Sequence, residues 1–446
     1  MAQSNKLLHL NVFIRGAGHH AGAWKHPQTN PKLDLTLDYY AELARIAERG
    51  LFDCLFMADN YSGLGRRLEP FTLLSALAAL TKHIGLIATV GTTYNDPYHV
   101  ARKFASLDYI SGGRAAWNIV TGHSQADADN FGKPGHPEVA KRYEIGDEFV
   151  RVTKQLWDSW EEDALVYDRA ADTTIDSNKV HEINFKGSYY SVKGPLNIPR
   201  PPQGYPVLVQ AGSSEGGKEL AAKTGEVVFT AQQTLGAAKQ FYADVKSRLA
   251  KYGRTPDQLL VMPGLGPIVA DTEAEAKDLE AELDSLVDAK KSLKYLSRYF
   301  DVDLADYPLD APVPVDKAKP YGSIDVGITS RHEVVIDAAR RENMTIRQFL
   351  SRSYGGHGHA TFTGSVVQVA DFIETWLREG GADGFNLLPA VFPGGLQTFV
   401  DKVVPELQNR GIFRTEYEGR TLRENLGLAR PDNVHKRVWA LSREAN

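Results

Sequence analysis

The chain has 446 residues, of which 42% are hydrophobic and 24% are charged, with a formal net charge of −5, and this predicts a soluble globular protein with a large core. Its single cysteine, Cys54, excludes a disulfide framework and fits a reducing, cytoplasmic location. We expect no membrane span, no signal peptide and no nucleic-acid partner, because long apolar stretches and basic blocks are absent, and a small molecule is the expected ligand.

Apolar runs typical of buried strands alternate with amphipathic stretches typical of helices. In chain order the pattern predicts a strand at 7–14, a helix at 37–49, a strand at 52–59, a helix at 69–83, a strand at 84–93, a helix at 97–112, a strand at 114–121 and a helix at 142–160. A hairpin at 181–195 follows, then strands at 206–212, 226–231 and 259–270 separated by helices, a helix from about 272, a helix at 366–381 and an eighth strand at 384–390.

Eight strands in alternation with helices imply a parallel sheet, and right-handed crossovers let it close. We therefore predict an α/β fold, a (β/α)8 TIM barrel, as one domain over 1–446. A doubly wound open sheet is the alternative, because periodicity does not show closure. Insertions are predicted after strands four and seven, at 161–205 with the hairpin and at 290–362. Within the second, the stretch 307–330 is rich in Pro, Asp and Gly, and we interpret it as part of a lid that includes His357 and His359.

In such a barrel the active site lies at the carboxyl ends of the strands. The residues expected there are Arg15, His19, His20, Trp24, Asp59, Asn60, Thr92, Thr93, Tyr94, Asn118, Thr121, His123, Gly212, Ser213 and Ser214. Motifs for zinc hydrolysis, P-loop chemistry and Rossmann nicotinamide binding do not occur. No third ligand accompanies His19 and His20, so we predict no metal site.

Five of the candidate residues allow more than one interpretation. Ser213 and Ser214, in the turn between a buried strand and a helix, either cap that helix or bind a phosphate group at its amino end. Asp59 either caps a turn or accepts a hydrogen bond from a ligand N–H group. Tyr143 either packs or donates its hydroxyl to a phosphate, and His123 is a donor, a general acid or a structural histidine.

Several long segments resemble the bacterial-luciferase-like flavin monooxygenases, in the branch of nitrilotriacetate monooxygenase component A, dibenzothiophene-sulfone monooxygenase and long-chain alkane monooxygenase. The segments are AGAWKHP, ERGLFDCLFMAD, VGTTYNDPYHVARKFASLDYISGGRAAWNIVT, VLVQAGSSEGGKELAAKTG and GIFRTEYEGRTLRENLGLARP. They run in matching order from about residue 8 to residue 431.

This resemblance implies a barrel that binds reduced FMN, supplied by a separate NAD(P)H:FMN oxidoreductase, and uses O2 to oxygenate a small substrate. The flavin contacts carried over are Asp59, Thr93, Thr121, Tyr143, Ser213 and Ser214, with the serines at the phosphate. His123 falls where the alkane enzyme has a pocket histidine, and His20 is the second candidate for chemistry. Gly122 is a departure, because relatives commonly carry serine there. A homodimer or homotetramer is expected by analogy.

The substrate is the open part of the prediction. An aminopolycarboxylate such as nitrilotriacetate is our first expectation, with oxidation next to nitrogen and C–N cleavage, and an organosulfur compound or alkane is second. A deazaflavin-dependent dehydrogenase and a flavin-binding protein without turnover are alternatives from other classes. Basic side chains on the expected mouth loops either bind an anionic substrate or are solvated surface charge, and these are Arg15, Lys25, Arg66, Arg67 and Lys133.

Overall fold

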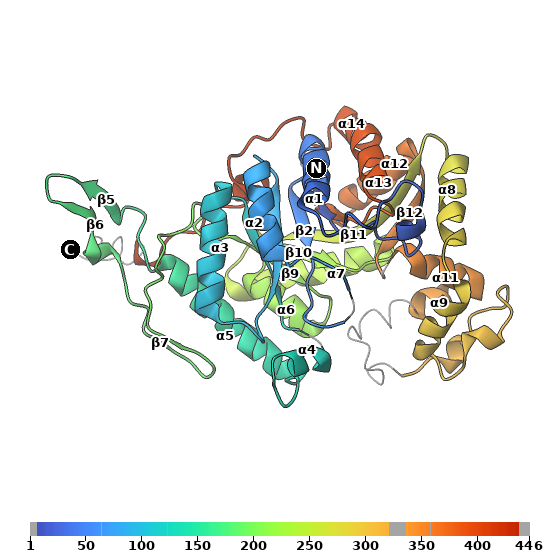
Figure 1. The fold of residues 1–446 in the computed structure, drawn as a ribbon, viewed down its shortest axis with the longest axis horizontal. Helices are drawn as coiled ribbons and strands as arrows, with labels where there is room; N and C mark the ends of the chain where they lie inside the picture. Colours follow the sequence, from blue (N-terminus) through green and yellow to red (C-terminus); the bar gives the residue numbers. More distant parts are fainter. Residues whose placement is uncertain (1–6, 64, 123, 321–335, 357, 437–446) are drawn as a thin grey trace.

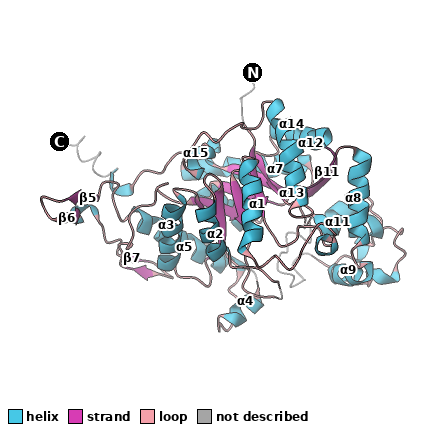
Figure 2. Ribbon diagram, turned by 45° about the horizontal axis from the view of Figure 1, so that its top comes forward, coloured by secondary structure: helices cyan, strands magenta, loops and turns pink. Residues whose placement is uncertain are grey.

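The computed structural model describes residues 7–63, 65–122, 124–320, 336–356 and 358–436. Eight parallel strands form a closed barrel surrounded by helices (Figures 1 and 2). In barrel order they are β1 (His9–Phe13), β2 (Cys54–Met57), β3 (Gly85–Gly91), β4 (Ala115–Val120), β9 (Val207–Ala211), β10 (Val227–Thr230), β11 (Leu260–Ala270) and β13 (Gly384–Leu387). Because β13 pairs with both β11 and β1, no edge stays open. The predicted barrel is confirmed, and the open-sheet alternative is wrong.

A helix follows each strand on the outside of the barrel. The main ones are α1 (Leu37–Arg49), α2 (Pro70–Leu80), α3 (Pro97–Ser111), α5 (Val139–Asp158), α6 (Glu215–Thr224), α7 (Leu235–Arg248), α8 (Glu273–Ser285), α12 (Val366–Arg378), α13 (Gly394–Thr398) and α14 (Val404–Asn409). Each crossover returns the chain to the same end of the barrel, so the carboxyl ends of the strands and the amino ends of the next helices share one face. Over the described ranges, no helix has both the length and the apolarity to cross a membrane.

The amino end of the barrel is closed by the C-terminal part of the chain. Short helix α15 (Leu422–Asn425) places Leu422 against the barrel interior, where it joins Leu426, Cys54 and Val207 in one apolar cluster. The Leu422 N–H donates to the carbonyl of Gly113, just before β4, at 2.9 Å. A ligand therefore reaches the barrel from its carboxyl end.

Between α5 and β9 the chain leaves the barrel through two small hairpins, at one side of Figure 1. The hairpin β7 (Phe185–Lys186) and β8 (Ser191–Val192) is the predicted one. The other, β5 (Leu165–Asp168) and β6 (Thr173–Ile175), was not predicted. Its residues are almost all exposed, so the sequence carries no alternation of buried and exposed positions that would reveal it.

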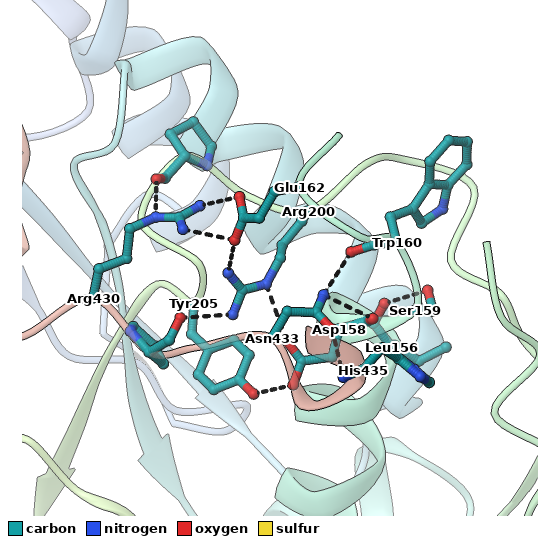
Figure 3. Close-up of polar contacts among 12 residues, drawn as sticks. Leu156, Asp158, Ser159, Trp160, Glu162, Arg200, Tyr205, Arg430, Asn433 and His435 are labelled. Atoms are coloured by element: carbon teal, nitrogen blue, oxygen red, sulfur yellow. Dashed lines mark hydrogen bonds and ion pairs between the residues drawn. The ribbon is translucent and has the colours of Figure 1, made fainter. Parts of the chain in front are cut away.

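The segment after α15 is tied to this insertion by ion pairs (Figure 3). Arg200 donates from Nε to Asp158 at 3.0 Å and also pairs with Glu162. Glu162 in turn receives both terminal nitrogens of Arg430, at 2.6 and 2.7 Å. Asn433 donates to the carbonyl of Trp160 at 2.8 Å. These contacts hold the C-terminal segment along the side of the barrel.

The insertion after β11 is a compact lobe, and only part of it is described. Helices α9 (Ala289–Leu296) and α11 (Ile346–Gly355) pack around their own apolar cluster with Phe300. Strand β12 (Ala360–Ser365), which the sequence pattern did not reveal, pairs in parallel with the outer half of β11. Residues 321–335 of the predicted lid, and His357, lie outside the described residues, so the lid stays a prediction.

Candidate active site

Two of the predicted site residues meet where β3 and β4 end. The Thr93 hydroxyl donates to the carbonyl of Thr121 at 2.7 Å, which ties the two loops together. Helix α5 lies directly on these strand ends, because a Cβ on its Gly146 would be 3.2 Å from Thr121 and 3.4 Å from the hydroxyl of Thr92. A glycine at this position lets the helix approach the barrel closely.

The two hydroxyls predicted to bind phosphate are also in contact. Ser214 is the N-cap of α6, and its Oγ accepts from the Gly217 N–H at 3.2 Å. The same Oγ lies 3.0 Å from the hydroxyl of Tyr143. The Tyr143 ring packs over Gly216, where a Cβ would come within 2.7 Å of it. Both interpretations of Ser214 are therefore compatible, since it caps the helix and presents an oxygen beside a second hydroxyl. Ser213 precedes it in the turn and is half-buried.

Arg142 lies beside Tyr143 and was not predicted as a site residue from the sequence. Its guanidinium donates to the carbonyl of Gly122, and its Nε is buried without a hydrogen-bond partner. No ion pair to Arg142 is found in the part of the chain that the structure describes, and burial lowers its pKa. A half-buried cation next to Tyr143 and Ser214 is suited to a bound anion. A single arginine in the charged run KRYE carries no signal that separates it from surface charge.

The position of His123 lies outside the described residues, but its neighbour Gly122 is defined. Gly122 has a φ of +72°, a conformation that favours glycine, and a Cβ there would be 3.2 Å from the ring of His136. The ring of His136 is held by the hydroxyl of Tyr94 at 2.6 Å. The glycine at this position therefore matches its local backbone.

Asp59 follows β2 on the same rim. Burial raises its pKa to about 6, and the charge of Arg67 acts in the opposite direction. A carboxyl group accepts hydrogen bonds when it is ionised and can also donate one when it is protonated.

Aromatic rings line the barrel below this rim. Phe13, Phe56 and Phe229 pack edge to face or tilted, with ring centres 5.0 to 6.2 Å apart. Two histidines close the group, because His19 contacts Phe13 at 4.7 Å and His359 stacks on Phe229 at 4.8 Å. The result is a largely apolar floor below the rim.

Deeper polar groups interrupt this floor. Asn11, Asn118 and Asn386 are buried, and the amide oxygen of each has no hydrogen-bond partner. Asn11 and Asn386 are in register on adjacent strands, and Asn118 donates to Thr89 at 2.9 Å. Unpaired buried acceptors are rare in folded proteins, so these oxygens are suited to a donor group of a ligand or to water.

His20 lies away from the Tyr143 and Ser214 pair, on the opposite side of the rim. Its Nδ1 accepts from the Gly22 N–H at 3.1 Å, and its Nε2 donates to Asp284 of α8 at 3.1 Å. The ring is buried and lines a separate cavity of about 320 Å³ between β11, β12 and α11. The geometry of His20 is thus fixed by two partners, one of them 264 residues away in sequence.

Comparison with known proteins agrees with this arrangement. Residues 13–383 match the luciferase-like monooxygenase family. The chain is 49% identical over 450 residues to nitrilotriacetate monooxygenase component A from Aminobacter aminovorans, covering 96% of this chain and 98% of that protein. It is 47% identical over 441 residues to N-acetyl-S-(2-succino)cysteine monooxygenase from Bacillus subtilis (strain 168), covering 97% and 99%. The solved structure of EDTA monooxygenase from Chelativorans sp. BNC1 aligns with a TM-score of 0.79 at 33% identity, over 96% of this chain and all of that one. The chain therefore belongs to the luciferase-like monooxygenases, as its sequence segments predicted.

Proposed function

We propose that this protein is the oxygenase component of a two-component system that binds FMNH2 from a separate NAD(P)H:FMN oxidoreductase and uses O2 to oxygenate a small polycarboxylate. Luciferase-like monooxygenases use reduced flavin. The observation that carries FMN in particular is the contact of Tyr143 with Ser214 at the amino end of α6. A helix amino end with hydroxyl donors is a common phosphate site.

The described residues fit FMN at both of its ends. Tyr143, Ser213 and Ser214 would hold the phosphate, and the buried, unpaired Nε of Arg142 supplies a positive charge beside them. At the ring end, we assign Asp59, Thr93 and Thr121 to the polar edge of the isoalloxazine. Asp59 is suited to an N–H group because a carboxylate oxygen accepts from such a donor and its carboxyl is half-buried on the rim.

When bound, reduced FMN supplies the two electrons that activate O2. The protein's part is to orient the flavin and keep water from the reacting atoms. Phe13, Phe56 and Phe229 supply the apolar surroundings, and the described rim offers few acids that would donate protons. We assign His123 to a contact with flavin or substrate. His20 lines the separate cavity between β11, β12 and α11, and we propose it as the second residue that acts on the substrate; Asp284 holds its tautomer.

Among substrates, we favour an aminopolycarboxylate such as nitrilotriacetate. One oxygen atom would enter the C–H bond next to nitrogen and the other would leave as water. The hydroxylated carbon would then release glyoxylate, with the nitrogen leaving as a secondary amine. The 49% identity to a nitrilotriacetate enzyme supports this choice.

A carboxylated thioether is the second candidate. The specific observation is the 47% identity to N-acetyl-S-(2-succino)cysteine monooxygenase, whose named substrate contains sulfur and more than one carboxylate. Both candidates are polyanions, so the charge of the substrate is better supported than the atom that is oxidised.

The test is a coupled assay with a general flavin reductase and NADH, scored by substrate-dependent product. We expect turnover of nitrilotriacetate or N-acetyl-S-(2-succino)cysteine that requires both FMN and O2. Riboflavin in place of FMN should fail, because it lacks the phosphate. Equal activity with riboflavin would contradict the phosphate assignment, and product formation without O2 would contradict an oxygenase.

A further inference from the structure

The cavity that His20 lines, of about 320 Å³, lies at the carboxyl ends of β11 and β13. It begins where these strands stop pairing, because Gly266 and Leu388 line it and each follows a residue of the last register pair. The order of the strands places β13 and β1 across the barrel from β9, which leads into Ser214. The cavity is therefore separate from the proposed phosphate site, and its volume suits a small ligand.

One wall of the cavity is a polar face of α11. This face is formed by positions three or four residues apart, which lie on one side of a helix, and they are Gln348, Ser351, Arg352 and Gly355. The opposite face of α11 is apolar and buried, with Phe349 and Leu350 in the cluster of the insertion lobe. The packing of the helix thus turns its polar residues to the cavity.

The facing wall is the outer half of the sheet. Thr361 of β12 is in register with Gly266 of β11, and Thr363 follows two residues later. Alternate residues of a strand point to the same side, so both threonines face the cavity. The walls meet at His20, since a Cβ on Gly355 of α11 would be 3.4 Å from the ring of His20. A bound ligand would therefore lie between the sheet, α11 and His20.

Glu280 brings a carboxylate into this lining. It belongs to α8 and is half-buried, and one of its oxygens accepts from the Thr363 hydroxyl at 2.9 Å. Over the described ranges no basic side chain forms an ion pair with Glu280, and Lys277, one turn before it, binds Glu273 instead. Withdrawing a carboxylate from water without a cationic partner is unfavourable. The second oxygen of Glu280 is therefore suited to a positively charged group of a ligand.

Arg352 supplies a donor on the α11 wall. Its two terminal nitrogens donate to Glu342 at 2.9 and 3.4 Å, and its Nε is buried with no hydrogen-bond partner among the described residues. The hydroxyls of Ser351 and Thr361 also have no partner in the part of the chain that the structure describes. An N–H group of a guanidinium together with two hydroxyls is suited to a carboxylate of a ligand.

We propose that this cavity binds the substrate by a protonated amine and a carboxylate, with the amine at Glu280 and the carboxylate at Arg352. The inference rests on the proposed function and deepens it, because it selects an aminopolycarboxylate over a carboxylated thioether. The nitrogen of nitrilotriacetate is basic and protonated at neutral pH, whereas the nitrogen of an N-acetyl group is an uncharged amide. Glu280 would thus attract the first substrate and repel the second.

The experiment measures the binding of nitrilotriacetate and methanetriacetate by calorimetry, in metal-free buffer, to the enzyme loaded with oxidised FMN. Methanetriacetate carries the same three carboxylates on carbon, so it lacks only the ammonium. We expect the wild-type enzyme to bind nitrilotriacetate at least tenfold more tightly. E280Q, which keeps an oxygen for the Thr363 hydroxyl, should remove this preference. R352K, which keeps a cation for Glu342 but has no donor at the position of Nε, should weaken the binding of both probes at least tenfold.

The matched controls are D278N and R347M. Asp278 is exposed on the same helix as Glu280, and Arg347 is exposed on α11, where it pairs with Asp310. Both control variants should bind the two probes like the wild type, and all four variants should keep the Kd of FMN within twofold. Thermal unfolding accompanies each titration, and equal Tm values show that a changed Kd does not reflect an altered fold.

Each outcome separates this proposal from the proposed function. Equal binding of the two probes by the wild-type enzyme, binding of neither, or a preference that E280Q retains would overturn the amine site while the flavin assignment stands. Tighter binding of nitrilotriacetate with added Mg²⁺ would also overturn it, because the nitrogen would then hold a metal ion instead of a proton. Unchanged Kd values for R352K would remove the carboxylate site. If FMN does not bind, the proposed function fails, and the same titrations of the apoprotein still decide whether the cavity selects the amine.

Discussion

Replacing Ser214 with aspartate should abolish most FMN affinity and leave the fold intact. Aspartate is as good an N-cap as serine, so α6 keeps the hydrogen bond that the Gly217 N–H now gives to Ser214. The added carboxylate would lie where the phosphate is expected, beside the hydroxyl of Tyr143. S214D therefore separates the capping role of Ser214 from its predicted binding role.

The size of the effect follows from charge repulsion. Two unit charges about 4 Å apart near a protein surface repel by about 4 kcal/mol, and the exposure of Ser214 reduces this to roughly 2 kcal/mol. Loss of the hydroxyl donor to a charged phosphate adds about 1 kcal/mol. The sum of about 3 kcal/mol corresponds to a rise in the Kd of FMN on the order of 100-fold.

The assay is titration of the apoprotein with oxidised FMN, followed by flavin fluorescence and repeated anaerobically with photoreduced FMN. T234D is the control, because Thr234 is the N-cap of the next helix, α7, on the same face of the barrel. T234D should bind FMN normally. A Kd for S214D within twofold of the wild-type value, with Tm unchanged, would refute the phosphate site.

Three further substitutions test individual features. D59N should stabilise the apoprotein at pH 8 but not at pH 4.5. The pKa of Asp59 is raised to about 6, so the ionised carboxyl destabilises the fold above that pH. This rise in pKa corresponds to about 3 kcal/mol, which solvent screening reduces to roughly 1 kcal/mol in thermal unfolding. G122S should cost roughly 1 to 2 kcal/mol in denaturant unfolding, since the φ of +72° strains a side chain, and an unchanged midpoint would contradict this. R114M should lower the free energy of unfolding by at least about 4 kcal/mol or prevent folding. The reason is that the buried Arg114 donates to four backbone carbonyls and to the hydroxyl of Thr81. A smaller loss would show that water replaces the guanidinium as the donor.

The barrel could be predicted from the sequence because its signals are local. The helix Leu37–Arg49 has the predicted bounds, since its apolar residues repeat on one face and Gly50 follows its last turn. The strand at 384–390 was found as the eighth because its run is apolar and preceded by a helix and glycines. Strand β12 was missed because its sequence, ATFTGS, is half-buried and lacks a regular alternation.

The candidate site was predictable only in part. Tyr143 and Ser214 were expected to share a ligand through the family resemblance, and the structure shows the two hydroxyls in contact. Arg142 was missed because its significance depends on the carbonyl of Gly122 and on burial, which the sequence does not display. His20 follows β1, whereas its partner Asp284 belongs to α8, 264 residues further along the chain. No short sequence spacing could predict this contact.

Leu422 and Leu426, which cover the amino end of the barrel, affect how the protein folds during synthesis. All eight barrel strands precede these leucines in the chain. During synthesis the strands therefore leave the ribosome before the leucines that cover their apolar amino end. Folding can then finish only after translation has passed residue 428. A nascent chain stalled before that point should be captured by chaperones that recognise apolar surface.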